Sequence, residues 1–205
     1  MEIRRIGIDF DNTIVRYDHV FLNAARQLEL VPTDFTGNKQ TLRDAIRLRP
    51  DGEIEWQKLQ GHVYGVGIEH ALLFDGVDLF LKRCRETNSE VFIVSHKTEF
   101  GHFDPSRVNL RHSALDWMAA SGFFCAQGFG IPVENVFFES TREEKLARIS
   151  SLKCSHFIDD LEEVLSHPDF PEGVDRILFA KRSNPLMPEI ECRETWHEIG
   201  KAVFE

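Results

Sequence analysis

Carboxylates crowd together at two places in the sequence, Asp9 with Asp11 and Asp159 with Asp160, each at the end of a short apolar run. Two carboxylates two residues apart at a strand end can face the same space. Such crowding is costly unless a positive charge lies beside it. One pair alone has an ordinary explanation in turns and helix caps. Two pairs after separate buried strands instead favour a shared site for a hard divalent cation, and these oxygen ligands suit Mg²⁺.

Other side chains that can bind phosphate or its metal occupy comparable positions. Two follow the first acidic pair, in a loop whose backbone N–H groups we expect to face a phosphate. Three end the second apolar run, and one cation lies on a helical segment ahead of the fourth. These residues are Asn12, Thr13, Ser95, His96, Lys97 and Lys145. Because ligands of open α/β sheets bind beyond the carboxyl ends of the strands, the sequence predicts a phosphate-binding site there.

Five short apolar runs are the candidate strands that position these groups. Near-continuous apolar runs suit strands buried on both faces, as in a parallel sheet covered by helices. Helical segments alternate with them, which predicts a doubly wound α/β fold, a three-layer α/β/α sandwich with a Rossmann-like parallel sheet. The expected strands are residues 3–10, 91–94, 135–138, 155–158 and 176–180. The expected helices are residues 76–87, 109–121, 141–150, 161–166 and 194–204.

The stretch between Asp11 and the second strand is too long for a simple crossover. It spans roughly eighty residues, where a strand–helix–strand unit takes ~30. Helix-like pieces at residues 20–30, 40–48 and 54–62 are separated by Pro and Gly. We therefore expect a small helical cap inserted after strand 1, formed by residues 16–74, and a core domain formed by residues 1–15 and 75–205.

The composition argues against several classes of partner. The formal net charge of −10 disfavours nucleic acid, whose phosphates reward clustered Lys and Arg. No run approaches the ~18 apolar residues that a membrane span needs. The four cysteines form no C-x-x-C pair and no signal-like run opens the chain, which is typical of reduced thiols in the cytoplasm. The sequence therefore predicts a cytoplasmic protein with neither a membrane nor a nucleic-acid partner.

Four motifs, in order, resemble those of the haloacid dehalogenase (HAD) superfamily. Residues 6–13, Ile-Gly-Ile-Asp-Phe-Asp-Asn-Thr, are similar to the first motif, an apolar strand followed by D-x-D-x-T. Residues 91–95 resemble the second, an apolar strand that ends in Ser or Thr. Lys145 resembles the third, and residues 157–160 the acidic fourth. The resemblance covers most of the chain, from residue 3 to residue 160.

This resemblance implies a Mg²⁺-dependent phosphatase of the HAD type. Asp9 would be the nucleophile that forms an aspartyl-phosphate, and Asp11 would be the general acid for the leaving group and then the base for water. Ser95 would donate a hydrogen bond to a phosphoryl oxygen, and Lys145 would offset negative charge. Asn12, Thr13, His96 and Lys97 are the further predicted substrate-binding residues. HAD dehalogenases and phosphonatases lack the second aspartate, so Asp11 favours phosphate esters.

The resemblance also implies how the metal is held. Asp9, the backbone carbonyl of Asp11 and Asp159 would bind Mg²⁺, and Asp160 would bind it directly or through water. Which of Asp159 and Asp160 binds directly stays open. Arg142 is a rival to Lys145 for the third motif.

Several functional alternatives stay open as well. The same site suits a phosphotransferase or phosphomutase, a 5′-nucleotidase, or a non-catalytic protein that binds a phospholigand. The expected partner is a small phosphorylated metabolite whose identity spacing cannot reveal, and the oligomeric state is equally open. His96, His102 and His112 follow the second strand without an ordinary zinc spacing, so their role is undecided.

Overall fold

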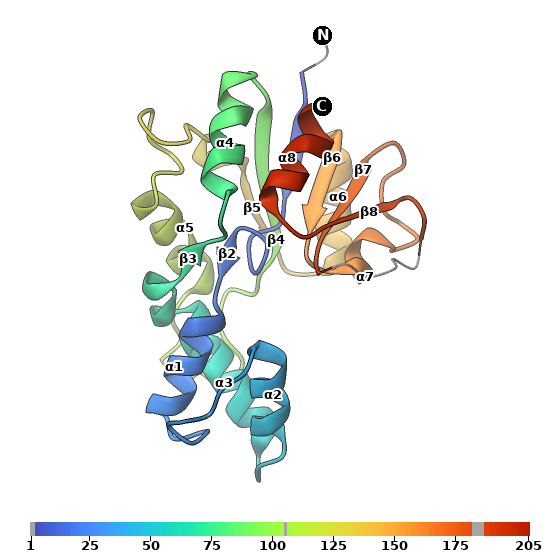
Figure 1. The fold of residues 1–205 in the computed structure, drawn as a ribbon. Coiled ribbons are helices and arrows are strands. Elements are labelled where there is room, and N and C mark those ends of the chain that lie inside the picture. The colour runs from blue at the N-terminus through green and yellow to red at the C-terminus, as the bar shows by residue number, and fades with distance from the viewer. Residues whose placement is uncertain (1–2, 105, 182–186) are drawn as a thin grey trace. The chain divides into compact units, whose positions relative to one another are not determined.

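Six strands of the computed structural model, which describes residues 3–104, 106–181 and 187–205, form one parallel sheet (Figure 1). Their spatial order is β5-β4-β1-β6-β7-β8. The strands are β1 (Arg5–Ile8), β4 (Glu90–His96), β5 (Val136–Glu139), β6 (His156–Asp159), β7 (Asp175–Phe179) and β8 (Ile190–Arg193). The predicted parallel α/β fold is confirmed. Two further strands of two residues each, β2 (Val15–Arg16) and β3 (Leu72–Leu73), form a separate small sheet.

The five predicted strands are all present, because each apolar run is buried in the sheet. Ile6 and Ile8 of β1 are fully buried between the neighbouring strands β4 and β6. The sixth strand, β8, was not predicted. It lies at the edge of the sheet, and its sequence Ile-Glu-Cys-Arg has Ile190 as its one buried residue. A short edge strand lacks the continuous apolar run by which a central strand is recognised.

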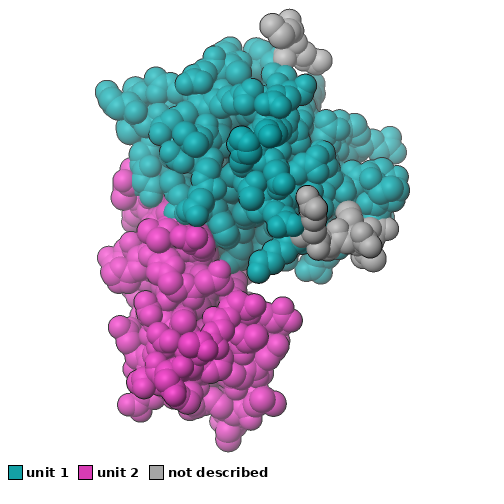
Figure 2. All heavy atoms as spheres, viewed as in Figure 1, with its two compact units in different colours: residues 1–15, 73–97, 121–205 teal, residues 16–72, 98–120 magenta. Residues whose placement is uncertain are grey.

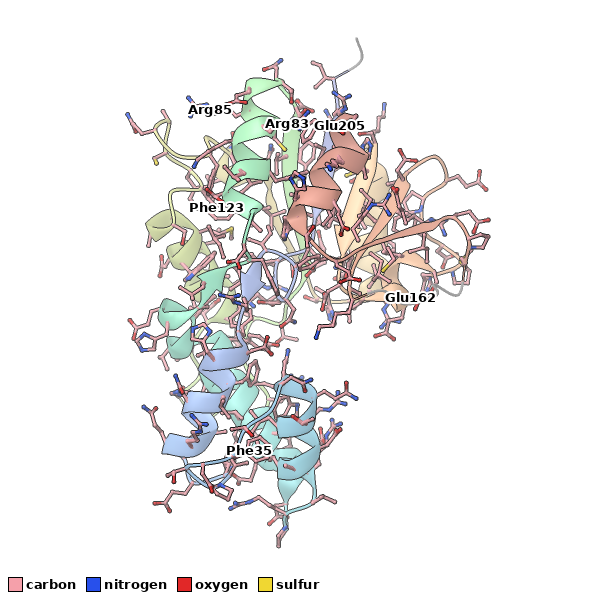
Figure 3. All side chains as sticks on the ribbon, in the orientation of Figure 1. Phe35, Arg83, Arg85, Phe123, Glu162 and Glu205 are labelled. Atoms are coloured by element: carbon pink, nitrogen blue, oxygen red, sulfur yellow. The ribbon has the colours of Figure 1, made fainter. Side chains whose placement is uncertain are left out.

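Helices pack on both faces of the sheet. Helix α6 (Arg142–Ser151) and the short α7 (Glu162–Leu165) share one apolar cluster with Phe92 and Val94 of β4. Helices α4 (Val77–Glu86) and α8 (Trp196–Phe204) pack against each other, with the rings of Phe80 and Trp196 5.0 Å apart. Figure 3 labels Arg83 and Glu205, whose ion pair of 3.9 Å joins the same two helices. The sheet is thus the middle of three layers.

The start of α6 is fixed by its sequence. The side chain of Thr141 accepts the backbone N–H of Glu144 at 3.1 Å, and the Glu144 carboxylate accepts the backbone N–H of Thr141 at 3.2 Å. This reciprocal capping box satisfies N–H groups that a helix end leaves without partners. The capping box fixes where the first turn of α6 begins. It therefore also fixes the direction in which the side chain of Lys145, at the end of that turn, projects from the helix.

The chain divides into two compact units, coloured separately in Figure 2. The first consists of residues 1–15, 73–97 and 121–205 and contains the six-stranded sheet, with the 3₁₀ turn η2 (Val133–Asn135). The second consists of residues 16–72 and 98–120. It holds α1 (Asp18–Gln27), α2 (Lys39–Arg47), α3 (Gly52–Tyr64), the 3₁₀ turn η1 (Val66–His70) and α5 (Leu110–Ala120). A helical insertion after β2 is therefore present.

The second unit has its own core. The rings of Phe21 and Trp56 stack 5.2 Å apart, and Trp117 of α5 donates an indole hydrogen bond of 3.2 Å to the carbonyl of Ala71. The division expected from the sequence, 16–74 against the rest, differs from these units at residues 73–74 and, more extensively, over the segment 98–120. That segment follows β4 in the chain, but α5 packs against α3 and η1, and such a long-range choice of partner leaves no mark in local sequence.

Candidate active site

The order in which successive strands are added to the sheet reverses next to β1. Such a reversal marks where a ligand can bind. From β1 the chain proceeds through β4 to β5 on one side, and it then places β6, β7 and β8 on the other side. In open parallel sheets the crevice at such a switch point, beyond the carboxyl ends of the strands, is the usual ligand site. Asp9, Ser95 and Asp159 lie at the carboxyl ends of β1, β4 and β6. The sheet therefore brings together residues that are far apart in sequence.

Lys145 lies at the centre of the site. Its Nζ donates to Oδ1 of Asp9 and to Oδ2 of Asp159, both at 2.7 Å. All three side chains are buried, with exposed fractions of 2%, 8% and 0%. Burial by itself lowers the pKa of Lys145, but the two carboxylates outweigh it, so the pKa lies above its ordinary value. The ammonium therefore stays charged between two acidic groups.

At Asp159, in contrast, burial outweighs the effect of the neighbouring ammonium on the pKa. Complete burial raises the pKa of its carboxyl to about 6, against the opposing pull of Lys145, and the negative charge of Asp9 adds to the rise. Its Oδ1 also accepts the backbone N–H of Leu161 at 2.9 Å, which fixes the orientation of the carboxylate. A second positive charge beside Asp159 would relieve this crowding.

Three carboxylates are arranged as a metal could use them. Oxygens of Asp9, Asp159 and Asp160 all lie within 4.8 Å of one another, and they form the one such group within the described ranges of the chain. With the Asp11–Lys97 pair counted, since Asp11 follows Asp9 by two residues, the site residues comprise four carboxylates and two ammonium groups, which leaves two negative charges when all are ionised. Charge and donor type therefore both fit a hard divalent cation such as Mg²⁺.

The loop after β1 is held by backbone and side-chain contacts. Asn12 has a φ of 62°, a left-handed conformation that Asn tolerates, and its N–H donates to the carbonyl of Val15 at 3.0 Å. The fully buried Thr13 has its Oγ1 3.4 Å from oxygens of both Asp9 and Asp160, and this atom accepts the N–H of Asp160 at 3.1 Å. Thr13 thereby connects the loop after β1 to the end of β6.

A second ion pair holds Asp11. Nζ of Lys97 lies 2.6 Å from Oδ2 of Asp11, and the lysine side chain is only 3% exposed. The backbone N–H of Lys97 donates to the carbonyl of Glu139 at 3.0 Å, so both ends of the residue are fixed. The sequence predicted Lys97 as a substrate contact, and in the structure its ammonium contacts the carboxylate of Asp11.

The remaining predicted residues lie in different surroundings. Ser95 is buried at the end of β4, paired with Phe138 of β5. His96 is exposed, and its Nε2 lies 2.9 Å from the carbonyl of Ser140. Arg142, the rival of Lys145, pairs with Glu163 at 3.4 Å on the surface. His102 and His112 are exposed and belong to the second unit, outside the aspartate group.

One contact that supports the site, from Trp196 to the loop after β1, was not predicted from the sequence. The indole Nε1 of Trp196, at the start of α8, donates to the carbonyl of Thr13 at 3.2 Å. The two residues are 183 positions apart. An aromatic residue at the start of a terminal helix is ordinarily interpreted as core, so local sequence contains no signal for this role.

The sheet order, the helical insertion and the site at the switch point define a HAD-like Rossmannoid α/β fold. No protein-family model matches the chain, and no curated protein matches it. The structural neighbours are HAD-superfamily hydrolases over nearly the full chain, at low sequence identity.

Three of these solved structures illustrate the likeness. A HAD-superfamily hydrolase from Ehrlichia chaffeensis is 15% identical, covers 99% of this chain and 97% of its own, and has a TM-score of 0.55. A predicted phosphoglycolate phosphatase from Haemophilus somnus is 12% identical, with 99% of each chain covered and a TM-score of 0.53. A HAD family hydrolase from Deinococcus radiodurans, with bound phosphate and sodium, is 11% identical, with 98% and 95% covered and a TM-score of 0.56.

Proposed function

We propose that the protein is a Mg²⁺-dependent phosphatase that hydrolyses a phosphate monoester of a small metabolite through an aspartyl-phosphate on Asp9. The observation that carries the proposal is the buried arrangement of Asp9, Lys145 and Asp159 with Asp160 alongside. Carboxylates so close together are costly without a cation, and a phosphate needs one too. Two similar structures support the substrate class, since one is a predicted phosphoglycolate phosphatase and another holds phosphate.

The first half of the reaction forms the covalent intermediate. A carboxylate oxygen of Asp9 attacks phosphorus, and the bond between phosphorus and the ester oxygen breaks. Asp11 gives its proton to that oxygen, so that an alcohol leaves. Lys145 keeps Asp9 oriented and offsets the negative charge of the phosphoryl group, while Ser95 is placed to donate a hydrogen bond to a phosphoryl oxygen.

The second half regenerates the enzyme. Water attacks the phosphorus of the aspartyl-phosphate, Asp11 takes a proton from that water, and phosphate leaves as Asp9 is restored. Mg²⁺, held by Asp9, Asp159 and Asp160 together with the Asp11 carbonyl, would supply positive charge that stabilises the phosphoryl oxygens in both halves. Asn12, Thr13 and the exposed His96 complete the proposed substrate contacts.

The proposal extends to the rest of the chain. Residues 16–74 are proposed as a cap that selects the substrate, and the protein is proposed to act in the cytoplasm. Of the described helices, none combines the length and the apolar character needed to cross a membrane.

Turnover of p-nitrophenyl phosphate, measured with Mg²⁺ and with EDTA, tests the proposal. We expect activity only with the metal, and its loss in Asp9→Asn, which keeps the shape of the side chain and removes its nucleophilic charge. Asp78→Asn is the matched control, because Asp78 is a half-exposed helix residue paired with Lys82 at the surface. Metal-dependent turnover that survives Asp9→Asn would refute the mechanism, and a folded wild type inactive on a panel of phosphate esters would refute the activity.

A further inference from the structure

We propose that Lys97 is a positioning residue that holds the carboxylate of Asp11 in place for proton transfer, and that it acts through Asp11 and not by binding the substrate. This inference rests on the proposed function, because Asp11 is the proton donor and acceptor there. The observation behind it is the ion pair of 2.6 Å between Lys97 Nζ and Asp11 Oδ2.

The surroundings of Lys97 show why its ammonium serves Asp11. The side chain is buried, and a buried ammonium is costly unless a counter-ion lies beside it. Nζ also lies 5.6 Å from the centre of the Phe10 ring, and an aromatic face attracts a cation. The Lys97 backbone is hydrogen-bonded to Glu139 of the neighbouring strand β5. The backbone of Lys97 is therefore held by β5, and its Nζ is directed at the carboxylate of Asp11.

The acidic cluster explains why Asp11 needs such a partner. Asp9, Asp159 and Asp160 already lie within 4.8 Å of one another, and Lys145 contacts two of them. Asp11 follows Asp9 by two residues, so its carboxylate adds negative charge to this region, and its side chain is 17% exposed, so burial alone does not fix its orientation. The two lysines pair with different carboxylates: Lys145 contacts Asp9 and Asp159, and Lys97 contacts Asp11.

A double-mutant cycle with Asp11→Asn and Lys97→Met tests whether the two residues act together. Lys97→Met removes a buried ammonium from beside the Asp11 carboxylate, so the melting temperature of the metal-free protein should fall. The double variant removes both charges and should regain most of that loss. Lys82→Met and Asp78→Asn, which break an exposed ion pair of 3.2 Å on α4, are the matched controls and should show no such coupling. A double variant that melts no higher than Lys97→Met would overturn the inference.

The kinetic part uses leaving groups that differ in their need for a proton. Phenolate is a poorer leaving group than nitrophenolate, so phenyl phosphate depends more on a proton donor. We expect Lys97→Met to lower kcat/KM about tenfold or more for phenyl phosphate and less than about threefold for p-nitrophenyl phosphate, since a general acid contributes about 10²–10⁴-fold. Lys97→Arg, which keeps the charge, should recover part of the loss, and Lys97→Met should cost nothing further in the Asp11→Asn background.

The outcomes separate this inference from the proposed function. An equal loss for both esters, or an additive loss in the double variant, would mean that Lys97 contacts the substrate and would overturn the positioning role. If the wild type hydrolyses no phosphate ester, the proposed function fails. The melting temperatures then still decide whether Lys97 holds Asp11.

Discussion

Nζ of Lys145 and Oδ2 of Asp159 lie 2.7 Å apart, and neither side chain is more than 2% exposed. The lysine projects from the first turn of α6, and the aspartate ends β6, the next strand along the chain. The two residues are therefore joined in sequence by the rest of α6 and by β6. The same ammonium also contacts Asp9 of β1. This buried triad holds the ends of two adjacent strands together, and any cation that binds there acts on an arrangement that is already formed.

Lys145→Met should therefore destabilise the protein strongly in the absence of metal. It leaves two buried carboxylates facing each other, and removal of one partner of a buried ion pair costs about 3–5 kcal/mol. Urea unfolding in EDTA measures the loss, and Mg²⁺ should restore part of it because a cation replaces the missing charge. The control is Arg142→Met, one turn earlier on the exposed face of α6, which should change the free energy of unfolding by less than about 1 kcal/mol. Equal effects of the two variants would contradict this account of the triad.

Metal binding should weaken as the pH falls through about 6, because that is the pKa to which burial raises the Asp159 carboxyl. The folded pKa lies above the unfolded value, so the metal-free protein loses stability as the pH rises from about 4 to about 6 and Asp159 ionises. Bound Mg²⁺ offsets this loss, since it needs the ionised carboxylate. The rise in melting temperature caused by Mg²⁺ should thus be larger at pH 7.5 than at pH 5.5. Asp159→Asn should lose most of that rise at both pH values, and a pH-independent metal effect in the wild type would refute the assignment.

The sequence allowed prediction of the features that depend on short-range patterns. The buried strand β1 is a continuous apolar run, and the proximity of Asp9 to Asp159 follows because the carboxyl ends of neighbouring parallel strands meet at one edge of the sheet. Lys145 was predicted from its place on a helical segment ahead of the fourth strand and from the resemblance, but sequence position alone did not exclude Arg142 three residues earlier. In the structure, the capping box at Thr141 fixes the start of α6, and Lys145 is one of its buried residues.

The features that escaped prediction depend on packing between distant parts of the chain. Which oxygen Lys97 contacts is decided by side-chain directions across two strands, and the indole of Trp196 reaches a carbonyl 183 residues away. The segment 98–120 follows a core strand yet packs with the second unit. None of these outcomes changes hydrophobic periodicity, which is the main signal available in a single sequence.

Trp196→Phe should weaken metal binding, because the lost indole N–H releases the carbonyl of Thr13 in the loop between Asp9 and β2. The ring stays apolar, so the cost in stability should be only about 1 kcal/mol, the value of one hydrogen bond. Trp117→Phe is a close control, since that indole also donates a hydrogen bond of 3.2 Å to a backbone carbonyl, that of Ala71 in the second unit. Both variants should lose similar stability in urea. Only Trp196→Phe should raise the dissociation constant for Mg²⁺ measured by calorimetry, and equal dissociation constants would mean that the loop needs no support from α8.

Gly7→Ala should disturb the site from beneath, through the packing of β1 against β6. A Cβ at Gly7 would lie 2.5 Å from a ring carbon of Phe157, closer than real contacts allow, and a tight 3.0 Å from the sulfur of Cys154. Phe157 is fully buried two residues before Asp159, so it cannot move without shifting the strand that carries the carboxylate. Overpacking of this kind costs about 1–3 kcal/mol.

Gly200→Ala makes the same chemical change, but we expect it not to lower the stability of the protein. Its added Cβ would meet only a ring carbon of Phe80, at an ordinary 3.9 Å, within helix α8. Because Ala is favoured over Gly in a helix by roughly 1 kcal/mol, this variant should be neutral or more stable. Urea unfolding of the two variants, with Mg²⁺ affinity measured in parallel, checks both. A Gly7→Ala protein as stable as the wild type would show that β1 and β6 can separate without loss, and the close packing beneath the aspartate cluster would then have no part in holding it.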